Sequence, residues 1–181
     1  TLILGPLEKL KKRLTDNENM VDLDTIDRNA KRLLLLVNQI LDERKIDKNQ
    51  MHLHCSKTEL VGFINGILTL YNYNANERNI TINFEHNDKE LFVWIDKINF
   101  DKVISNLLSN AFKYTFDGGE VTVLLSKDDK NAEIKVIDNG IGFNDEKIDR
   151  LFERFYQGGN SKDLHIEGSG IGLNLCKAIV T

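Results

Sequence analysis

The hydrophobic pattern of the chain changes character once, close to residue 57, and this change limits the architectures that the sequence allows. Before it, apolar residues recur in steps of three and four, beginning with Ile3, Leu7, Leu10 and Leu14. That spacing is typical of helices that pack through one apolar seam. From Thr58 onward, helical spacing alternates with short runs in which every second residue is apolar, which is the period of a half-buried strand. The pattern therefore predicts a helical unit followed by a unit of helices and strands.

Residues 1–46 have the pattern of two helices separated by the polar residues 15–19. The apolar stripe of the second helix consists of Leu23, Ile26, Ala30, Leu33, Val37 and Ile40. Two amphipathic helices joined by a short loop predict an antiparallel hairpin. One hairpin alone would expose a wide apolar stripe, so we expect two copies to pair as a four-helix bundle in a homodimer. Residues 47–57 are polar and without periodicity, and they are predicted to be a linker.

Residues 58–181 alternate between helical and strand-like segments. Helices are predicted around residues 60–71 and 100–111 and after residue 172, and strands around 80–84, 91–95, 121–125 and 134–136. Turn-like residues 86–89 and 128–131 lie between consecutive strands. This order predicts an α+β fold in which helices cover a mixed sheet in a two-layer sandwich.

Composition excludes several other classes of protein. The net charge of −4 gives no basic footprint for nucleic acid. The two cysteines, Cys55 and Cys176, lie far apart and form neither a metal-binding motif nor a disulfide framework. The longest apolar run, residues 33–37, is too short to cross a bilayer, so we expect any membrane anchor to lie outside this segment.

The helix predicted around residue 107 carries a polar stripe as well as an apolar one. Its apolar residues Val103, Leu107, Leu108 and Ala111 can face the sheet, whereas the opposite face presents Asn106, Asn110, Lys113 and Tyr114. An asparagine oxygen is a hard, neutral ligand suited to Mg²⁺ that already carries phosphates and waters. A lysine one turn further on can neutralise phosphate oxygens. The alternative interpretation is an ordinary solvated helix face.

A second motif follows a predicted strand. Asp138 stands at the strand end, where a carboxylate can accept a hydrogen bond from an exocyclic amine such as that of adenine. Gly140 and Gly142 then remove side chains where a flat base would approach the backbone. The alternative is a plain Asp-Asn-Gly turn.

A third motif, Gly168, Gly170 and Gly172, leads into the last predicted helix and could bind phosphate through free amides. Its spacing is neither the dinucleotide fingerprint nor a P-loop. Before it, the aromatic Phe152 and Phe155 precede a polar segment, residues 157–168, which we expect to be a mobile lid hinged at the two rings. The alternative places these rings in the core.

Taken together and in this order, the motifs resemble the boxes of the histidine-kinase ATPase family: the N box at 106–115, the G1 box at 138–142, the F box at 152–156 and the G2 box at 168–172. The resemblance implies a Bergerat-type ATPase fold. Because the family also includes type II topoisomerase, Hsp90 and MutL ATPases, fold alone does not decide the reaction. Residues 36–47 resemble the second dimerisation helix of sensor histidine kinases, and the presence of this helix favours a kinase. Residues 1–7 resemble the segment directly after the H-E-x-R-T-P-L box, and this segment is most similar in sequence to that of hybrid sensor kinases.

The resemblance implies ATP and Mg²⁺ as cofactors and assigns roles to the boxes. Asn110 would be the Mg²⁺ ligand, with Asn106 beside the metal and phosphates. Lys113 would contact phosphate, Tyr114 would lie along the base or ribose, and Asp138 would bind the adenine amine. The remaining nucleotide-binding positions are then Gly140 and Gly142 at the base, Phe152 and Phe155 at the lid, and Gly168, Gly170 and Gly172 at the phosphates.

Three departures from the family pattern affect this assignment. None of His52, His54, His86 and His165 lies in a matching H box, so the phospho-accepting histidine is expected upstream of Thr1. Gln157 stands where many of these kinases carry arginine, and the family usually continues beyond Thr181 into further sheet.

The function implied is transfer of the ATP γ-phosphate to a histidine on the hairpin, and then to the aspartate of a response-regulator receiver domain, in cis or in trans. The segment would be the cytoplasmic portion of an inner-membrane sensor. Two alternatives stay open: a nucleotide-binding signalling module without transfer activity, and an ATPase of the same superfamily that performs conformational work.

Overall fold

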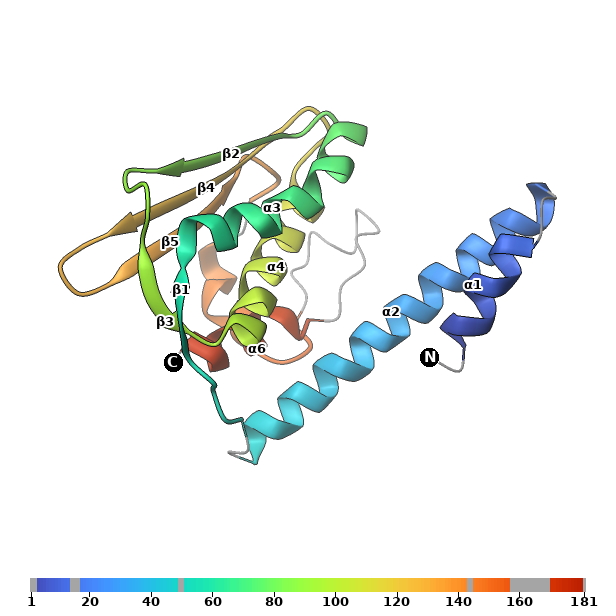
Figure 1. The fold of residues 1–181 in the computed structure, drawn as a ribbon, viewed down its shortest axis with the longest axis horizontal. Helices are drawn as coiled ribbons and strands as arrows, with labels where there is room; N and C mark the ends of the chain where they lie inside the picture. Colours follow the sequence, from blue (N-terminus) through green and yellow to red (C-terminus); the bar gives the residue numbers. More distant parts are fainter. Residues whose placement is uncertain (1–2, 14–16, 49–50, 143–144, 157–169, 181) are drawn as a thin grey trace. The chain divides into compact units, whose positions relative to one another are not determined.

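A computed structural model of the chain describes residues 3–13, 17–48, 51–142, 145–156 and 170–180. The chain divides into two compact units, residues 1–51 and residues 52–181. The first unit is helical, and the second contains both helices and strands (Figure 1).

The first unit consists of α1 (Leu4–Arg13) and α2 (Asn17–Asp47), which pack against each other. Leu7 and Leu23 are buried between them. On the same helix pair, Lys11 Nζ lies 2.7 Å from Asp24 Oδ1 and 2.9 Å from Asp27 Oδ2. Helix α2 starts at residue 17, inside the segment predicted to be a loop.

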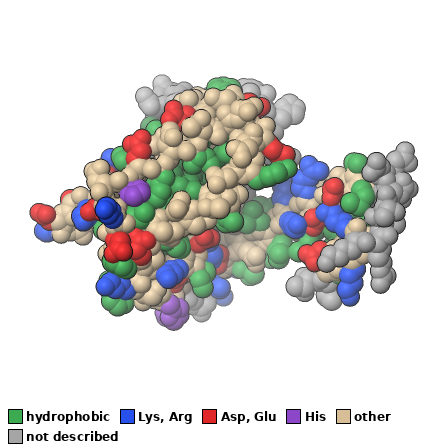
Figure 2. All heavy atoms as spheres, turned by 45° about the horizontal axis from the view of Figure 1, so that its top comes forward, with side chains coloured by type: hydrophobic (Ala, Val, Ile, Leu, Met, Phe, Trp, Pro, Cys, Tyr) green, Lys and Arg blue, Asp and Glu red, His purple; other side chains and the backbone are tan. Residues whose placement is uncertain are grey.

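Much of the apolar stripe of α2 is exposed. The large apolar side chains that remain exposed in its second half are Leu33, Leu34, Leu35, Val37, Ile40 and Leu41. Exposed apolar side chains are visible on the surface of the molecule (Figure 2). None of the helices described has the combination of length and apolar character that crossing a membrane requires.

The second unit contains five described strands in two groups. Strand β1 (Ser56–Glu59) pairs antiparallel with β3 (Phe92–Ile95). Strand β2 (Thr81–His86) pairs parallel with β4 (Glu120–Lys127), and β4 pairs antiparallel with β5 (Ala132–Asp138). The second group is therefore a mixed sheet, as predicted.

Two details of the strands differ from the sequence-based expectation. Strand β1 starts at residue 56, inside the predicted linker, because Ser56 and Lys57 pair with Ile95 and Trp94. Residues 86–89 separate β2 from β3 without joining them in a hairpin, since each strand pairs with a different partner.

Helices α3 (Leu60–Glu77) and α4 (Lys97–Tyr114) pack side by side and share one core with the strands (Figure 1). The most deeply buried side chains of this core are Leu60, Ile64, Ile104, Leu108, Val121 and Val123. The 3₁₀ helix η1 (Asp145–Phe152) and helix α6 (Gly172–Val180) complete the unit. The two-layer α+β prediction is confirmed.

Acidic caps fix the starts of both long helices. Glu59 accepts hydrogen bonds from Val61 N and Gly62 N at the start of α3. Asp96 accepts from Ile98 N at 3.0 Å and Asn99 N at 3.1 Å at the start of α4. Its second oxygen accepts from His54 N at 2.9 Å. One carboxylate therefore holds both the start of α4 and the backbone of the segment that precedes β1.

Candidate functional site

Helix α4 presents different residues to the core and to the outside. Its buried residues are Val103, Ile104, Leu108, Ala111 and Phe112. Leu107, predicted to face the sheet, is only partly buried. The predicted site residues Asn106, Asn110, Lys113 and Tyr114 are all partly exposed, as groups that bind a ligand must be.

The start of α6 lies against the polar stripe of α4. A methyl group added at Gly172 would lie 2.7 Å from Asn106 Oδ1, which means that the backbone of α6 occupies the space directly beside this amide. Cys176, one turn further along α6, is buried, and its Sγ lies 3.8 Å from Val103 O. Burial raises the pKa of the Cys176 thiol to about 11, although a hydrogen bond with Asn106 opposes this shift. The structure therefore brings the N-box and G2-box positions together.

The other end of α4 lies against the residues that follow β5. Ile141 N donates to Tyr114 O at 3.1 Å. A methyl group at Gly140 would lie 2.6 Å from the Tyr114 carbonyl carbon, so only glycine allows this approach. Gly140 N also donates to Asp138 Oδ1 at 3.0 Å. That contact is the Asp-Asn-Gly turn of the alternative interpretation, and it uses one of the two carboxylate oxygens.

Gly170 adjoins the aromatic segment. Phe155 N donates to Gly170 O at 3.0 Å, and both residues have positive φ, 59° at Phe155 and 66° at Gly170. From α6, Asn174 Nδ2 donates to Phe152 O at 2.9 Å. Phe152 is 40% exposed and Phe155 is 65% exposed, so the alternative that placed these rings in the core is wrong. Gly168 and the proposed lid lie outside the described residues.

Two of the predicted ligand-binding side chains contact each other. Lys113 Nζ lies 3.2 Å from the hydroxyl oxygen of Tyr114 and 4.7 Å from the centre of its ring. Gly142 also has a positive φ, 66°, and its chain neighbours aside, none of the described residues lies within 4 Å of where its Cβ would be. Around α4 the structure thus assembles four of the proposed positions by direct contact: Asn106 with Gly172, and Tyr114 with Gly140.

The chemistry of this site does not suit a metal held by protein alone. Among the residues that the structure describes, no cluster of three or more histidine, cysteine or acidic side chains could hold a cation. The half-buried amide of Asn110 is a single neutral donor. This donor set fits Mg²⁺ that arrives with most of its ligands supplied by phosphates and water.

Sequence reasoning missed the residues that hold the site elements in place. Asn174 holds the aromatic segment, and Thr115 is buried with its Oγ1 donating to Ala111 O at 2.7 Å. Arg78, at the end of α3, donates to carbonyl oxygens at the end of α4. Hydrophobic periodicity contains no signal for such contacts, because they are hydrogen bonds from polar side chains to backbone carbonyls, and those of Asn174 and Arg78 join residues that are distant in sequence.

Comparison with known proteins identifies the family. Residues 95–181 match the family model described as histidine kinase-, DNA gyrase B- and HSP90-like ATPase. The chain belongs to this ATPase family. The match spans α4, the Asp-Asn-Gly segment and α6, which are the elements that meet in the geometry described above.

Relatives with similar sequences are named histidine kinases. The chain is 34% identical to Histidine kinase P4 of Formosa agariphila and to Sensor histidine kinase TmoS of Ectopseudomonas mendocina, with 99% of the chain covered in both cases. It spans only 13% and 19% of the lengths of these two relatives. The chain thus contains the ATPase-domain region that is found in sensor histidine kinases.

Solved structures confirm the fold. Full-length ShkA, crystallised in complex with AMPPNP, superposes with a TM-score of 0.80 at 22% identity, covering 98% of this chain and 36% of ShkA. The catalytic domain of the histidine kinase ThkA gives a TM-score of 0.63 at 22% identity, covering 70% of this chain and 80% of that domain.

Proposed function

We propose that the second unit binds Mg–ATP at the exposed face of α4 and that the whole protein transfers the γ-phosphate to a histidine. The observation that carries the proposal is the contact of α4 with both glycine segments, at Gly172 and at Gly140. These contacts place the backbone of the glycine segments close to the Asn106 amide and to Tyr114, whose hydroxyl contacts Lys113. That combination can hold phosphates and a flat base.

In this proposal each residue has one task. Asp138 accepts the adenine amine, Lys113 neutralises phosphate oxygens, and Asn110 supplies an oxygen to Mg²⁺ with Asn106 beside it. When bound, Mg²⁺ would neutralise charge on the phosphates. The domain then acts by positioning the nucleotide and stabilising its charge, rather than by covalent chemistry of its own.

The first unit is proposed to provide dimerisation. Its exposed apolar stripe on α2 is the support for pairing with a second copy in a four-helix bundle. A receiver domain is the proposed recipient of the phosphate; a complex of the kinase ThkA with a response regulator, TrrA, has been crystallised. The proposed boundaries are residues 1–46 for the hairpin, 47–57 for the linker and 58–181 for the catalytic domain. We also propose that the whole protein is attached to an inner membrane through parts outside this segment.

Nucleotide binding is tested by calorimetry with ATP and GTP, with and without Mg²⁺. Asp138→Asn should weaken ATP binding by about 10- to 100-fold, because a charge-assisted hydrogen bond is lost. Asp101→Asn, on an exposed position near the start of α4, is the matched control and should bind normally. Equal affinity of the unmodified chain for ATP and GTP would contradict the assignment of Asp138.

The metal assignment needs its own measurement. Asn110→Ala should remove most of the gain in ATP affinity that Mg²⁺ provides and should leave adenosine binding unchanged. If the affinities with and without Mg²⁺ fall alike, Asn110 has a structural role.

Phosphoryl transfer is tested with radiolabelled ATP. The 181-residue chain should take up no acid-labile phosphate, because none of its four histidines lies in an H-box sequence. The same chain should phosphorylate a histidine on a supplied helical segment that carries the H box. Label on His52, His54, His86 or His165 would overturn this assignment. Absence of transfer to the supplied segment would favour the signalling module without kinase activity.

A further inference from the structure

Arg78 joins the end of one helix to the end of another. It is the C-cap residue of α3, and the next residue, Asn79, has a positive φ of 51°. The α3 chain then ends with Ile80 N donating to Ala75 O at 2.8 Å. The way in which α3 ends places Arg78 beside the last turn of α4.

All three guanidinium nitrogens of Arg78 donate hydrogen bonds at or next to that turn. Nη1 donates to Phe112 O at 2.5 Å, Nη2 donates to Thr115 O at 2.8 Å, and Nε donates to Asp117 Oδ1 at 2.7 Å. The carbonyls of a last helical turn have no partners within the helix, and a cation there is also favoured by the helix dipole. Arg78 therefore satisfies carbonyl groups that α4 itself leaves open.

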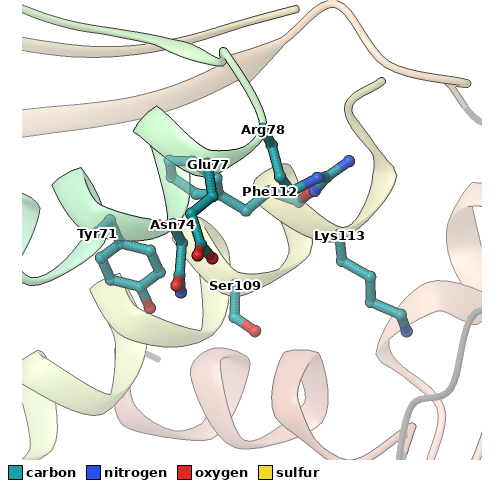
Figure 3. Close-up of a pocket in the computed structure, with 7 residues that line it drawn as sticks. All are labelled: Tyr71, Asn74, Glu77, Arg78, Ser109, Phe112 and Lys113. Atoms are coloured by element: carbon teal, nitrogen blue, oxygen red, sulfur yellow. The ribbon is translucent and has the colours of Figure 1, made fainter. Parts of the chain in front are cut away.

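The two carbonyls that Arg78 binds flank Lys113 and Tyr114 in the sequence. Tyr114 has a separate anchor, because its carbonyl accepts from Ile141 N. Among the described residues, the glycine segment donates no backbone hydrogen bond to Lys113, and the nearest contacts of Arg78 with this turn are at residues 112 and 115. In Figure 3, Arg78 reaches over the end of α4 near Phe112, while the Lys113 side chain points away from Glu77 and Arg78.

A hollow of about 270 Å³ between α3 and α4 is bordered by Glu77, Arg78, Phe112 and Lys113, among other residues. Lys113 could lean into this hollow, where Glu77 offers a carboxylate, or away from it. In the structure the Lys113 side chain is directed away from Glu77, with its Nζ 3.2 Å from the Tyr114 hydroxyl oxygen, and the helical turn that carries it is held by Arg78. We propose that Arg78 is a positioning residue for nucleotide binding, which holds the last turn of α4 so that Lys113 is directed to the phosphates. This inference rests on the proposed function of the site.

The test is a double-mutant cycle of Arg78 and Lys113 in which the affinities for ATP and for adenosine are both measured. Arg78→Lys keeps the charge but cannot span two carbonyls and a carboxylate together. It should weaken ATP binding about three- to tenfold and change adenosine binding less than about twofold, as expected when one to two hydrogen-bond equivalents are lost. In a Lys113→Met background, the same Arg78→Lys change should reduce ATP affinity less than about twofold, since the side chain that it positions is absent. Arg28→Lys, at an exposed position of α2, is the control and should have no effect.

Two results would overturn the inference. One is an equal loss of ATP and adenosine affinity in Arg78→Lys, which indicates a purely structural residue. The other is an undiminished ATP effect in the Lys113→Met background. If Arg78→Lys does not fold, Asp117→Asn decides, because it removes only the carboxylate that holds Nε; a roughly twofold weakening of ATP alone is expected, and no change would overturn the inference. An unmodified chain that binds neither ligand would refute the proposed function, whereas normal binding by Arg78→Lys would refute this inference alone.

Discussion

The Asn106 amide oxygen lies where a side chain at position 172 would have to be, 2.7 Å from the Cβ that any other residue would place there. The obstacle is the end of a rotatable side chain and not backbone. A residue larger than glycine at 172 can therefore be accommodated, but only by turning Asn106 away from its present direction.

Gly172→Ala should therefore separate binding from stability. Gly172 is the first residue of α6, outside the helix interior, and the Asn106 side chain can rotate aside, so the melting temperature should change little. The affinity for Mg–ATP should decrease about tenfold, the equivalent of one hydrogen bond that Asn106 no longer makes. Calorimetry and thermal unfolding together check this. The control is Gly66→Ala in α3, where no atom lies within 4 Å of the new methyl group; it should raise stability and leave affinity unchanged. Unchanged affinity in Gly172→Ala would contradict the expected role of Asn106.

Gly140→Ala should behave in the opposite way. Here the added methyl group meets the Tyr114 backbone, which cannot rotate aside, and the hydrogen bond from Ile141 N to Tyr114 O must lengthen. We expect a loss of about 1–3 kcal/mol in the free energy of unfolding, as for other overpacked sites. Urea denaturation measures it, with Gly172→Ala as the comparison because it adds the same methyl group. A loss no larger than in Gly172→Ala would show that the end of α4 adapts easily.

Asp96 should make the second unit sensitive to acid. The hydrogen bond from His54 N, together with those from Asn99 and Ile98 and despite partial burial, holds the pKa of the Asp96 carboxyl below its ordinary value. A group with a lowered folded-state pKa stabilises the protein fully above its unfolded-state pKa, and this stabilisation is lost as the pH falls through the folded-state value. Unfolding free energy should thus decrease between about pH 5 and pH 3. In Asp96→Asn, denaturant titrations over this range should show a shallower decrease, and an identical slope would exclude Asp96 as a contributor.

The two cysteines should react at very different rates. Cys55 is exposed, whereas Cys176 is buried and its pKa is raised to about 11, so at pH 8 its thiol is protonated as well as inaccessible. A chromogenic disulfide reagent should modify one thiol per folded chain rapidly. Cys55→Ser should abolish that fast phase, and denaturant should restore reaction at Cys176. Two fast thiols in the folded chain would show that α6 separates readily from α4.

Leu33→Asn should weaken the proposed dimer. Leu33 is 63% exposed on α2, and an asparagine there would be left without partners inside a four-helix bundle. Sedimentation should show a shift towards monomer. Leu70→Asn is the matched control, since Leu70 is similarly exposed but lies on α3 in the other unit, and it should leave the association state unchanged. A monomeric unmodified chain would contradict the proposed pairing.

The sequence predicted helices and strands well where one side of each element is buried. The strand around Val121 and Val123 and the helix around Leu108 follow their periods because these side chains enter the core. Pairing was harder to predict: β2 joins β4 rather than the next strand, β3, and no local residue pattern encodes a choice of partner so distant in sequence.

The candidate site was predictable to the extent that it consists of short motifs. Asn106 and Tyr114 were singled out by helical spacing, and the structure places glycines of the other motifs against both. The surroundings of Lys113 were not predictable, since the last turn of α4 that carries it is bound by the Arg78 guanidinium, which comes from the end of α3. Leu107, which was predicted to be able to face the sheet, is only partly buried, because the buried face of α4 extends to Ile104 and Phe112.

The parallel pairing of β2 with β4 also has a consequence for folding. Thr81 lies opposite Glu120, and the chain between these strands contains β3 and the whole of α4. A parallel pair needs such a crossover, so α4 belongs to the connection that joins the two paired strands. We therefore expect backbone amides of α4 and β4 to exchange with solvent deuterium only through the same global opening. The helix that carries the nucleotide-binding residues would then be a cooperative part of the scaffold, folded whenever the sheet is folded and before any nucleotide arrives.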